Sequence, residues 1–109
     1  QKGHTAMAWA DLACCQVERQ AYPEAVEAAD RALALEPKHM EALYNRGRAR
    51  FGLKQYREGR EDLASALATG QADASMAQNL RQNIAMADRY LAYREKAPRK
   101  ASAKTKAVR

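Results

Sequence analysis

Glycine, proline and β-branched residues are scarce in this chain of 109 residues, which has five glycines and three prolines. Most of the apolar share of 47% is alanine and leucine, a composition that favours helices over strands. No run of 18 or more apolar residues occurs, which argues against a membrane-spanning helix, and no secretory signal peptide is recognisable. The length excludes a large two-lobed enzyme. These absences predict a single all-α domain.

Cysteine is nearly absent, and the two cysteines, Cys14 and Cys15, are adjacent. Neighbouring positions on a helix point about 100° apart, which prevents an easy mutual disulfide. A metal site needs more ligands at suitable spacing, and His4 and His39 are isolated. We therefore expect two reduced core cysteines, no metal, no cofactor and a cytoplasmic or nuclear protein. Because the chain starts at Gln1, we also expect a fragment or a processed product.

Acidic side chains are missing from the C-terminal end, and this explains the net charge of +6. Residues 1–95 hold 13 basic and 13 acidic side chains, so the usual inference from excess positive charge to a nucleic-acid-binding face fails for them. Residues 98–109 also lack aromatic and large aliphatic side chains, and we expect them to be a disordered basic tail. The cations of this end are Lys96, Arg99, Lys100, Lys104, Lys106 and Arg109.

The apolar side chains follow helical periodicity. Pro23 suits the first turn of a helix. Pro37 ends another, because the residue before a proline is pushed out of the α region. In the last segment the apolar residues step by three and four and make one stripe. The pattern predicts five helices, over about residues 5–17, 23–35, 40–53, 56–69 and 74–97.

Residues in the first part of the chain match residues in the second part at a constant separation along the sequence, and we call this separation the repeat step. Small residues recur where two helices must touch, and large ones where a core must be filled. Such an offset, with two helices in each unit, indicates an array of helical hairpins. The aligned pairs are Trp9 and Leu43, Ala13 and Gly47, Tyr22 and Tyr56, Ala25 and Gly59, Ala32 and Ala66, and Leu33 and Leu67.

In these positions the chain resembles the tetratricopeptide repeat, whose 34-residue unit has the same length as the repeat step. The resemblance covers residues 6–73, and Gln16, Arg50, Gly59 and Gln71 depart from it. It implies an α-solenoid domain over residues 1–97, with repeats 6–39 and 40–73 and a capping helix 74–97. The first repeat carries Trp9, Leu12, Ala13, Tyr22, Ala25, Ala32, Leu33 and Pro37. The second carries Leu43, Gly47, Tyr56, Leu63, Ala66 and Leu67.

The resemblance implies a protein-interaction scaffold rather than an enzyme. In this family the first helices of successive hairpins line a concave groove that holds a peptide or protein segment. The residues that would face this groove are Ala10, Cys14, Glu41, Tyr44, Asn45, Arg48, Gln78 and Gln82, with Met7, Val17 and Asn79 beside them.

The stretch ALYNRGRARFGLKQYREGREDLASAL looks like the final repeat of co-chaperones and immunophilins. In those proteins a clamp of Lys, Asn and Arg holds the acidic C-terminus of heat-shock chaperones, since cations and amides can fix two carboxylates at once. One alignment places the clamp cations at Glu41 and Asn45, and the other places the clamp Lys and Asn at Ala10 and Cys14. A chaperone-associated context is thus implied, with the clamp itself largely absent.

No catalytic motif is recognisable, and we expect no enzyme. The charged residues of the fourth helix, Arg57, Glu58, Arg60, Glu61 and Asp62, are expected to form a solvated face.

Two alternatives stay open. The basic tail could bind nucleic acid or an anionic membrane, with the repeats as a dimerisation scaffold, or could only solubilise or target the protein. Met86, Tyr90 and Tyr93 widen the apolar stripe of the last helix, which favours a homodimer through that helix.

Overall fold

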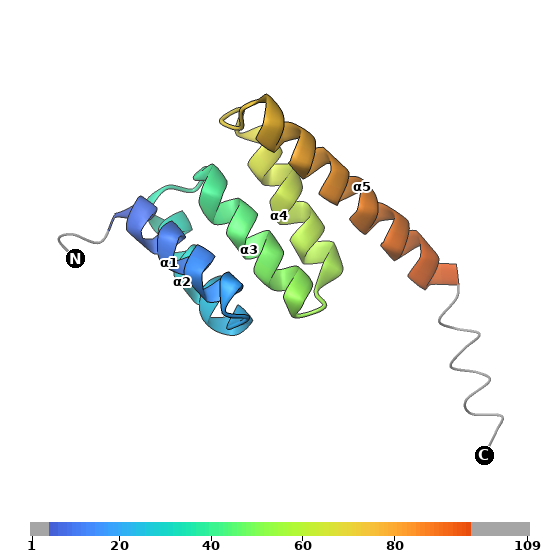
Figure 1. Ribbon diagram of the computed structural model, residues 1–109, viewed down its shortest axis with the longest axis horizontal. Helices are drawn as coiled ribbons and strands as arrows, with labels where there is room; N and C mark the ends of the chain where they lie inside the picture. The colour runs from blue at the N-terminus through green and yellow to red at the C-terminus, as the bar shows by residue number, and fades with distance from the viewer. Residues whose placement is uncertain (1–4, 97–109) are drawn as a thin grey trace, which may run out of the picture.

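The computed structural model describes residues 5–96, and this part of the chain contains helices and no strand. The helices are α1 (Ala6–Glu18), α2 (Tyr22–Leu35), α3 (Met40–Gly52), α4 (Tyr56–Ala68) and α5 (Ala74–Lys96) (Figure 1). The prediction of an all-α protein with five helices is confirmed for these residues, with most boundaries within a residue or two. The predicted disordered tail, 98–109, lies outside them.

No helix in the described part of the chain is both long and apolar enough to cross a membrane.

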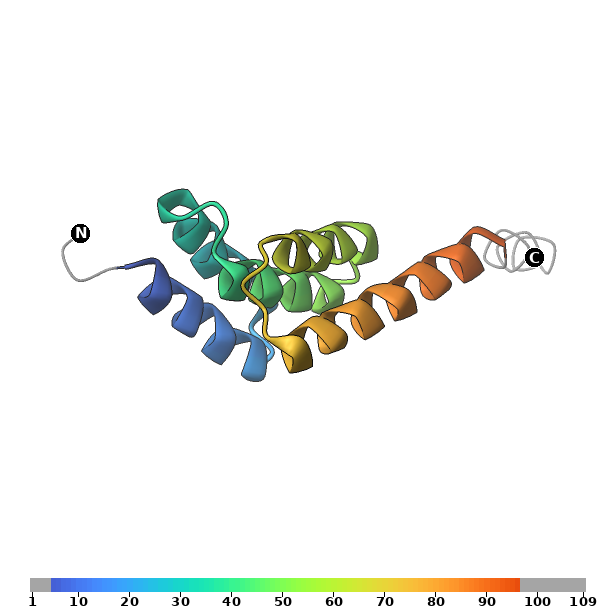
Figure 2. The same cartoon turned by 90° about the horizontal axis from the view of Figure 1, so that it is seen from above.

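The helices pack as two hairpins followed by a long helix. α1 packs against α2 and α3 against α4, while α3 also contacts both helices of the first hairpin and α5 packs on α4. Seen from above, α2 and α4 lie on one side of the molecule and α1 and α5 on the other (Figure 2). The radius of gyration is 16.3 Å, against about 13 Å for a compact domain of this length. The molecule is therefore an elongated array.

The repeat step is visible in the helix starts, because α1, α3 and α5 begin at Ala6, Met40 and Ala74. The residue before each of these helices caps it. Thr5 Oγ1 accepts from the Ala8 amide at 3.1 Å, His39 Nδ1 from Ala42 at 3.2 Å, and Asp73 Oδ1 from Met76 at 2.8 Å. Each cap satisfies one of the backbone N–H groups that a helix start leaves without a partner. The three capping residues, Thr5, His39 and Asp73, are themselves one repeat step apart.

The two hairpin turns also repeat. Gln20 and Lys54 follow the ends of α1 and α3, and both have a left-handed backbone, with φ of 62° and 67°. The next amide in each turn donates 2.8 Å back to the preceding helix, Ala21 to the Gln16 carbonyl and Gln55 to that of Arg50. This is a Schellman-type helix end, in which glycine is the favoured left-handed residue. In both turns the left-handed position is occupied by a residue with a side chain, Gln20 or Lys54, instead of glycine.

Replacing Lys54 by glycine is expected to raise the free energy of unfolding by about 0.5–1 kcal/mol, because glycine adopts a left-handed backbone without the steric cost of a Cβ. Gln20→Gly should do the same. Urea denaturation measures both effects. Gly70→Ala, at a glycine with φ of 75°, is the opposite control and should lower stability. A loss of stability in both glycine variants would contradict the turn geometry.

Small residues set the helix crossings, as the repeat predicted. A Cβ on Gly59 would lie 3.0 Å from the Gly47 carbonyl oxygen and 2.9 Å from the Phe51 ring. The backbones of α3 and α4 therefore approach to a distance that admits no side chain here. In the first hairpin the same two positions hold Ala13 and Ala25, both fully buried.

A buried polar network joins α2, α3 and α4. It corrects the expected solvated face at Asp62, whereas Arg57, Glu58 and Glu61 are exposed as predicted. Asp62 is only 4% exposed, and its carboxylate accepts from Arg46 Nε and Nη2 at 3.0 and 2.9 Å and from Arg50 Nη1 at 3.0 Å. Arg46 Nη1 also donates to Asp30 of α2 at 2.8 Å. Burial lowers the pKa of Arg46, but its bonds to the two carboxylates outweigh this and raise it overall. Asp62 thus belongs to the core.

A buried leucine and a surface ion pair are two of the contacts that hold α5 on the body. Leu80 is fully buried against Leu43 of α3 and Leu63 of α4. Arg60 of α4 donates to both carboxylate oxygens of Asp88 at 2.8 and 3.2 Å, and these hydrogen bonds lower the pKa of Asp88. Asp88 stands one repeat step after Lys54, yet α5 continues through it without a turn.

Candidate functional site

The predicted groove residues fall into two groups. Ala10 and Asn45 are buried, with exposed fractions of 1% and 4%, which leaves them almost no surface for a ligand. Ala10 packs with Ala42 of α3, where the two hairpins meet. Asn45 lies one helical turn from Ala42, on the face that α3 turns to the first hairpin. The other predicted residues are partly or fully exposed: Cys14, Glu41, Tyr44, Arg48, Gln78 and Gln82.

The cysteines also differ from the prediction of a core position. Cys14 is partly buried and Cys15 is exposed, and both are free thiols. Cys15 is exposed because it lies on the side of α1 that faces away from α2 and α3.

Arg48 is the centre of the candidate site. Its Nη1 donates to Asn45 Oδ1 at 3.1 Å and its Nη2 to Glu18 Oε2 at 3.2 Å. Its guanidinium carbon also lies 5.4 Å from the centre of the Tyr44 ring, a distance at which a cation is attracted to an aromatic face. Arg48 therefore links α3 to the last turn of α1, across the junction between the hairpins.

This arrangement holds the guanidinium in place without burying it, since the Arg48 side chain is 29% exposed. A guanidinium has five N–H groups, and the two hydrogen bonds above leave others that can donate to a carboxylate or a main-chain carbonyl. A side chain fixed in advance loses less entropy when it binds. Tyr44 adds a partly exposed aromatic surface beside the charge.

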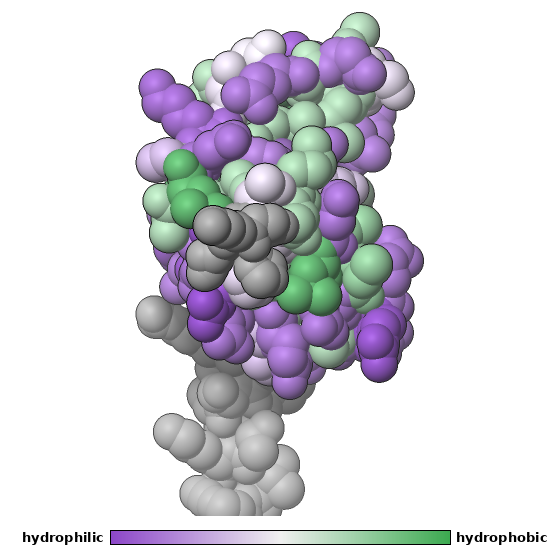
Figure 3. Space-filling model, turned by 90° about the vertical axis from the view of Figure 1, so that its left-hand side faces the viewer, coloured by the Kyte–Doolittle hydropathy of each residue, from purple (hydrophilic) through white to green (hydrophobic). Residues whose placement is uncertain are grey.

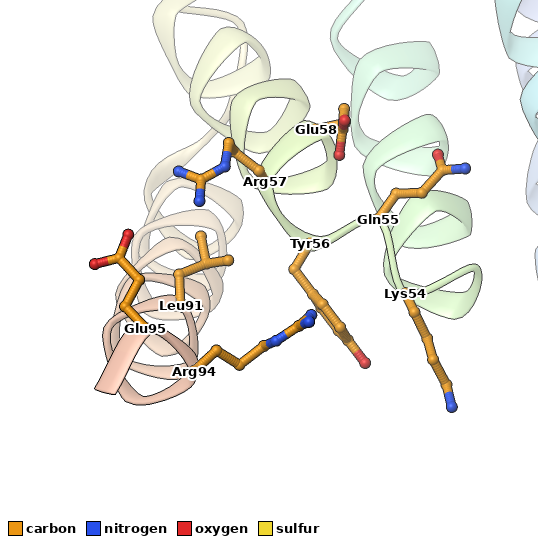
Figure 4. Close-up of a pocket in the computed structure, with 8 residues that line it drawn as sticks. All are labelled: Lys54, Gln55, Tyr56, Arg57, Glu58, Leu91, Arg94 and Glu95. Carbon is orange, nitrogen blue, oxygen red and sulfur yellow. The ribbon is translucent and has the colours of Figure 1, made fainter. Parts of the chain in front are cut away.

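Two neighbouring pockets were not expected from the sequence. One, of about 420 Å³, lies between the start of α4 and the end of α5, with Leu91 and Arg94 facing Tyr56 across it (Figure 4). The second, of about 360 Å³, is apolar and is bordered by Phe51, Tyr56, Met86 and Tyr90. The rings of Tyr56 and Tyr90 are 4.5 Å apart. Loss of hydration and the nearby Tyr90 hydroxyl raise the pKa of Tyr56.

The sequence carried a signal for this contact that the repeat alignment did not use. Tyr90 follows Tyr56 by one repeat step, as Tyr56 follows Tyr22. The two predicted repeats end at residue 73, so Tyr90 lies outside them and the sequence predicts it only as part of a widened helix face.

Within residues 5–96 no group of three or more His, Cys, Asp or Glu side chains is arranged to hold a metal ion. No protein-family model matches the chain, and no curated protein is similar to it. The described residues define an all-α protein built from helical hairpins whose first helices start one repeat step apart.

Proposed function

We propose that this protein is a tetratricopeptide-type scaffold that binds a peptide or protein segment on the face formed by α1 and α3, with α5 beside them. The observation that carries the proposal is Arg48, positioned between Glu18, Asn45 and the Tyr44 ring while still exposed. The repeated helix starts, caps and turns support the repeat assignment. The segment offers a carboxylate or carbonyl to Arg48 and an apolar group to Tyr44.

Replacing Arg48 by glutamate is expected to weaken binding of a carboxylate-bearing peptide about tenfold or more, because a charge-assisted hydrogen bond becomes a repulsion. The measurement is fluorescence polarisation with a panel of acidic, neutral and basic peptides of equal length. Arg48→Gln, which removes the positive charge without reversing it, should give an intermediate loss.

Arg57→Glu is the matched control, because it makes the same charge change at an exposed position on α4, in the opposite helix layer. It should leave the peptide affinity unchanged, and circular dichroism should show both variants folded. Equal losses in the two variants would mean that net charge, not the Arg48 site, governs binding, and the proposal would fail.

A co-chaperone context is supported only by the sequence resemblance. Of the expected clamp positions, Ala10 and Asn45 are buried, Cys14 is partly buried and is not a basic residue, and Glu41 is an exposed acid. The amide oxygen of Asn45 already accepts a hydrogen bond from Arg48. Among the described residues, Arg48 is thus the basic group best placed to meet an acidic chaperone tail, and the acidic peptide of the panel tests that ligand.

The second candidate function rests on the charge distribution, with six cations and no acid in residues 96–109. Binding of these residues to nucleic acid or to anionic lipid predicts an affinity that falls steeply with salt. Deletion of residues 98–109 should abolish that binding and leave peptide binding at Arg48 intact. Arg48→Glu and the deletion of residues 98–109 should therefore each remove one of the two functions and leave the other.

A further inference from the structure

The outer side of α1 repeats a surface that is buried on α3. Three positions of α3 that face the first hairpin are almost fully buried: Ala42, Asn45 and Ala49, with exposed fractions of 0, 4 and 0%. Ala42 packs with Ala10 and Ala32, and Ala49 with Val17 and Ala25. The positions one repeat step earlier, on α1, are all exposed: Ala8, Asp11 and Cys15.

α1 therefore has small side chains, Ala8 and Cys15, on a side that no helix within residues 5–96 covers. Leu12, one turn from Ala8 and Cys15, is 41% exposed. Figure 3 shows this end of the molecule, where apolar side chains lie among hydrophilic ones. Such a face lets another helix approach closely, as the first hairpin approaches α3.

A hollow of about 390 Å³ adjoins this face, between α1 and α2. Trp9, Leu12 and Ala28 contribute apolar surface to it, and Glu24 and Glu27 stand at its border. Arg31 also lines the hollow, where it stacks over Trp9 at 5.0 Å and lies 3.8 Å from Glu27. Asp11 is exposed on α1 beside Leu12 and adds a further carboxylate to this side of the molecule. The surface is therefore apolar at its centre and offers acids to a basic partner.

The opposite end of the molecule exposes apolar side chains and a basic one, which complement the apolar and acidic surface of the first hairpin. α5 buries Ala77, Leu80 and Ala87 against the body, and its other side exposes Met86 by 60% and Tyr93 by 64%. Arg89 lies between these two at helical spacings of three and four, so the three side chains share one face. Figures 1 and 2 show α5 and the first hairpin at the two ends of the long axis.

We propose that this protein associates with itself head to tail, the exposed face of α5 in one copy (Met86, Arg89 and Tyr93) packing on the outer face of α1 in the next (Ala8, Leu12 and Cys15). Arg89 of one copy then meets Asp11 of the other, and neither residue has an ion-pair partner within residues 5–96 of its own chain. A second copy fits because one chain supplies both halves of the contact. Since the two surfaces differ, the contact is heterologous and generates a ring or an open row of molecules.

Sedimentation velocity over a range of concentrations, at low salt, tests the association. The wild type should show a mass that rises with concentration, whereas Leu12→Asp and Met86→Asp should each remain monomeric. Leu35→Asp, which changes a leucine of 55% exposure outside both faces, should associate like the wild type. Circular dichroism checks that all variants fold, which their exposed positions favour. A wild type that stays monomeric at every soluble concentration overturns the proposal.

Mixing the two disabled variants distinguishes head-to-tail association from a symmetric dimer. Leu12→Asp keeps its α5 face and Met86→Asp keeps its α1 face, so the mixture should form a one-to-one complex that grows no further. Asp11→Arg should block association and Arg89→Asp in the partner should restore it, in a salt-dependent way. A mixture that remains monomeric, or association that survives in either single variant, overturns the proposal.

Discussion

Replacing Asp62 by alanine is expected to lower the free energy of unfolding by about 2–4 kcal/mol, the largest effect that we expect of a polar substitution within residues 5–96. The carboxylate is 4% exposed and receives three hydrogen bonds from Arg46 and Arg50. Without it, Arg50 loses its carboxylate partner and Arg46 keeps only the exposed Asp30, so two partly buried guanidinium groups lie close together with one counter-charge fewer. Equilibrium urea unfolding followed by circular dichroism measures the loss.

Asp30→Ala is the matched control. Asp30 accepts from the same Arg46 at 2.8 Å, but its side chain is 53% exposed, and solvent screens such a pair to a value below about 1 kcal/mol. If the two substitutions cost the same, burial is not what makes Asp62 important, and the assignment of this residue to the core is wrong.

Leu80→Ala is expected to cost about 2–4 kcal/mol and to release α5 before the rest of the array. Leu80 is fully buried, and it fills the space between α5 and the leucines of the second hairpin. Because α5 contacts α4 but neither helix of the first hairpin, the loss should be local. Native-state hydrogen exchange should therefore show faster exchange of α5 amides, with little change in α1 and α2.

Leu91→Ala controls for the loss of a leucine on the same helix, since Leu91 is partly exposed near the C-terminal end of α5. It should cost less than Leu80→Ala. Equal acceleration of exchange in α1, α2 and α5 after Leu80→Ala would show that the array unfolds as one unit, against this expectation.

The repeat spacing predicted most of the fold because the same local signals recur in each unit. The helix starts follow from residues that act on their immediate neighbours, and the small residues at the crossings recur at the same place in each hairpin. A single repeat step then places α3 and α4 as copies of α1 and α2. These features depend on short-range physics, which a sequence displays directly.

Asp62 was mistaken for a surface residue because it stands among exposed charges. The buried positions of α4 are Gly59, Asp62, Leu63 and Ala66, a spacing of three, four and seven that marks the inner stripe of a helix. The spacing alone therefore indicates that Asp62 is buried. What the sequence did not show is that Arg46 and Arg50, on another helix, would reach the carboxylate.

The groove prediction failed at Ala10 for a similar reason. The buried residues of α1 are Ala6, Ala10, Ala13 and Val17, which again share one stripe, so Ala10 belonged to the packing face. Family geometry assigned it to the ligand side instead. The cluster around Arg48 could not be predicted, because it depends on how closely Glu18 of α1 approaches α3.

α5 runs straight through Asp88, where the other two units reverse direction after a left-handed residue. Because α5 does not reverse at this position, it packs on α4 as a single helix within residues 5–96. The third unit of the described array therefore differs from the first two by the absence of one turn rather than by a change at its helix start. Since α1 belongs to a hairpin and α5 does not, the two ends of the described array are unlike, and the array has a direction.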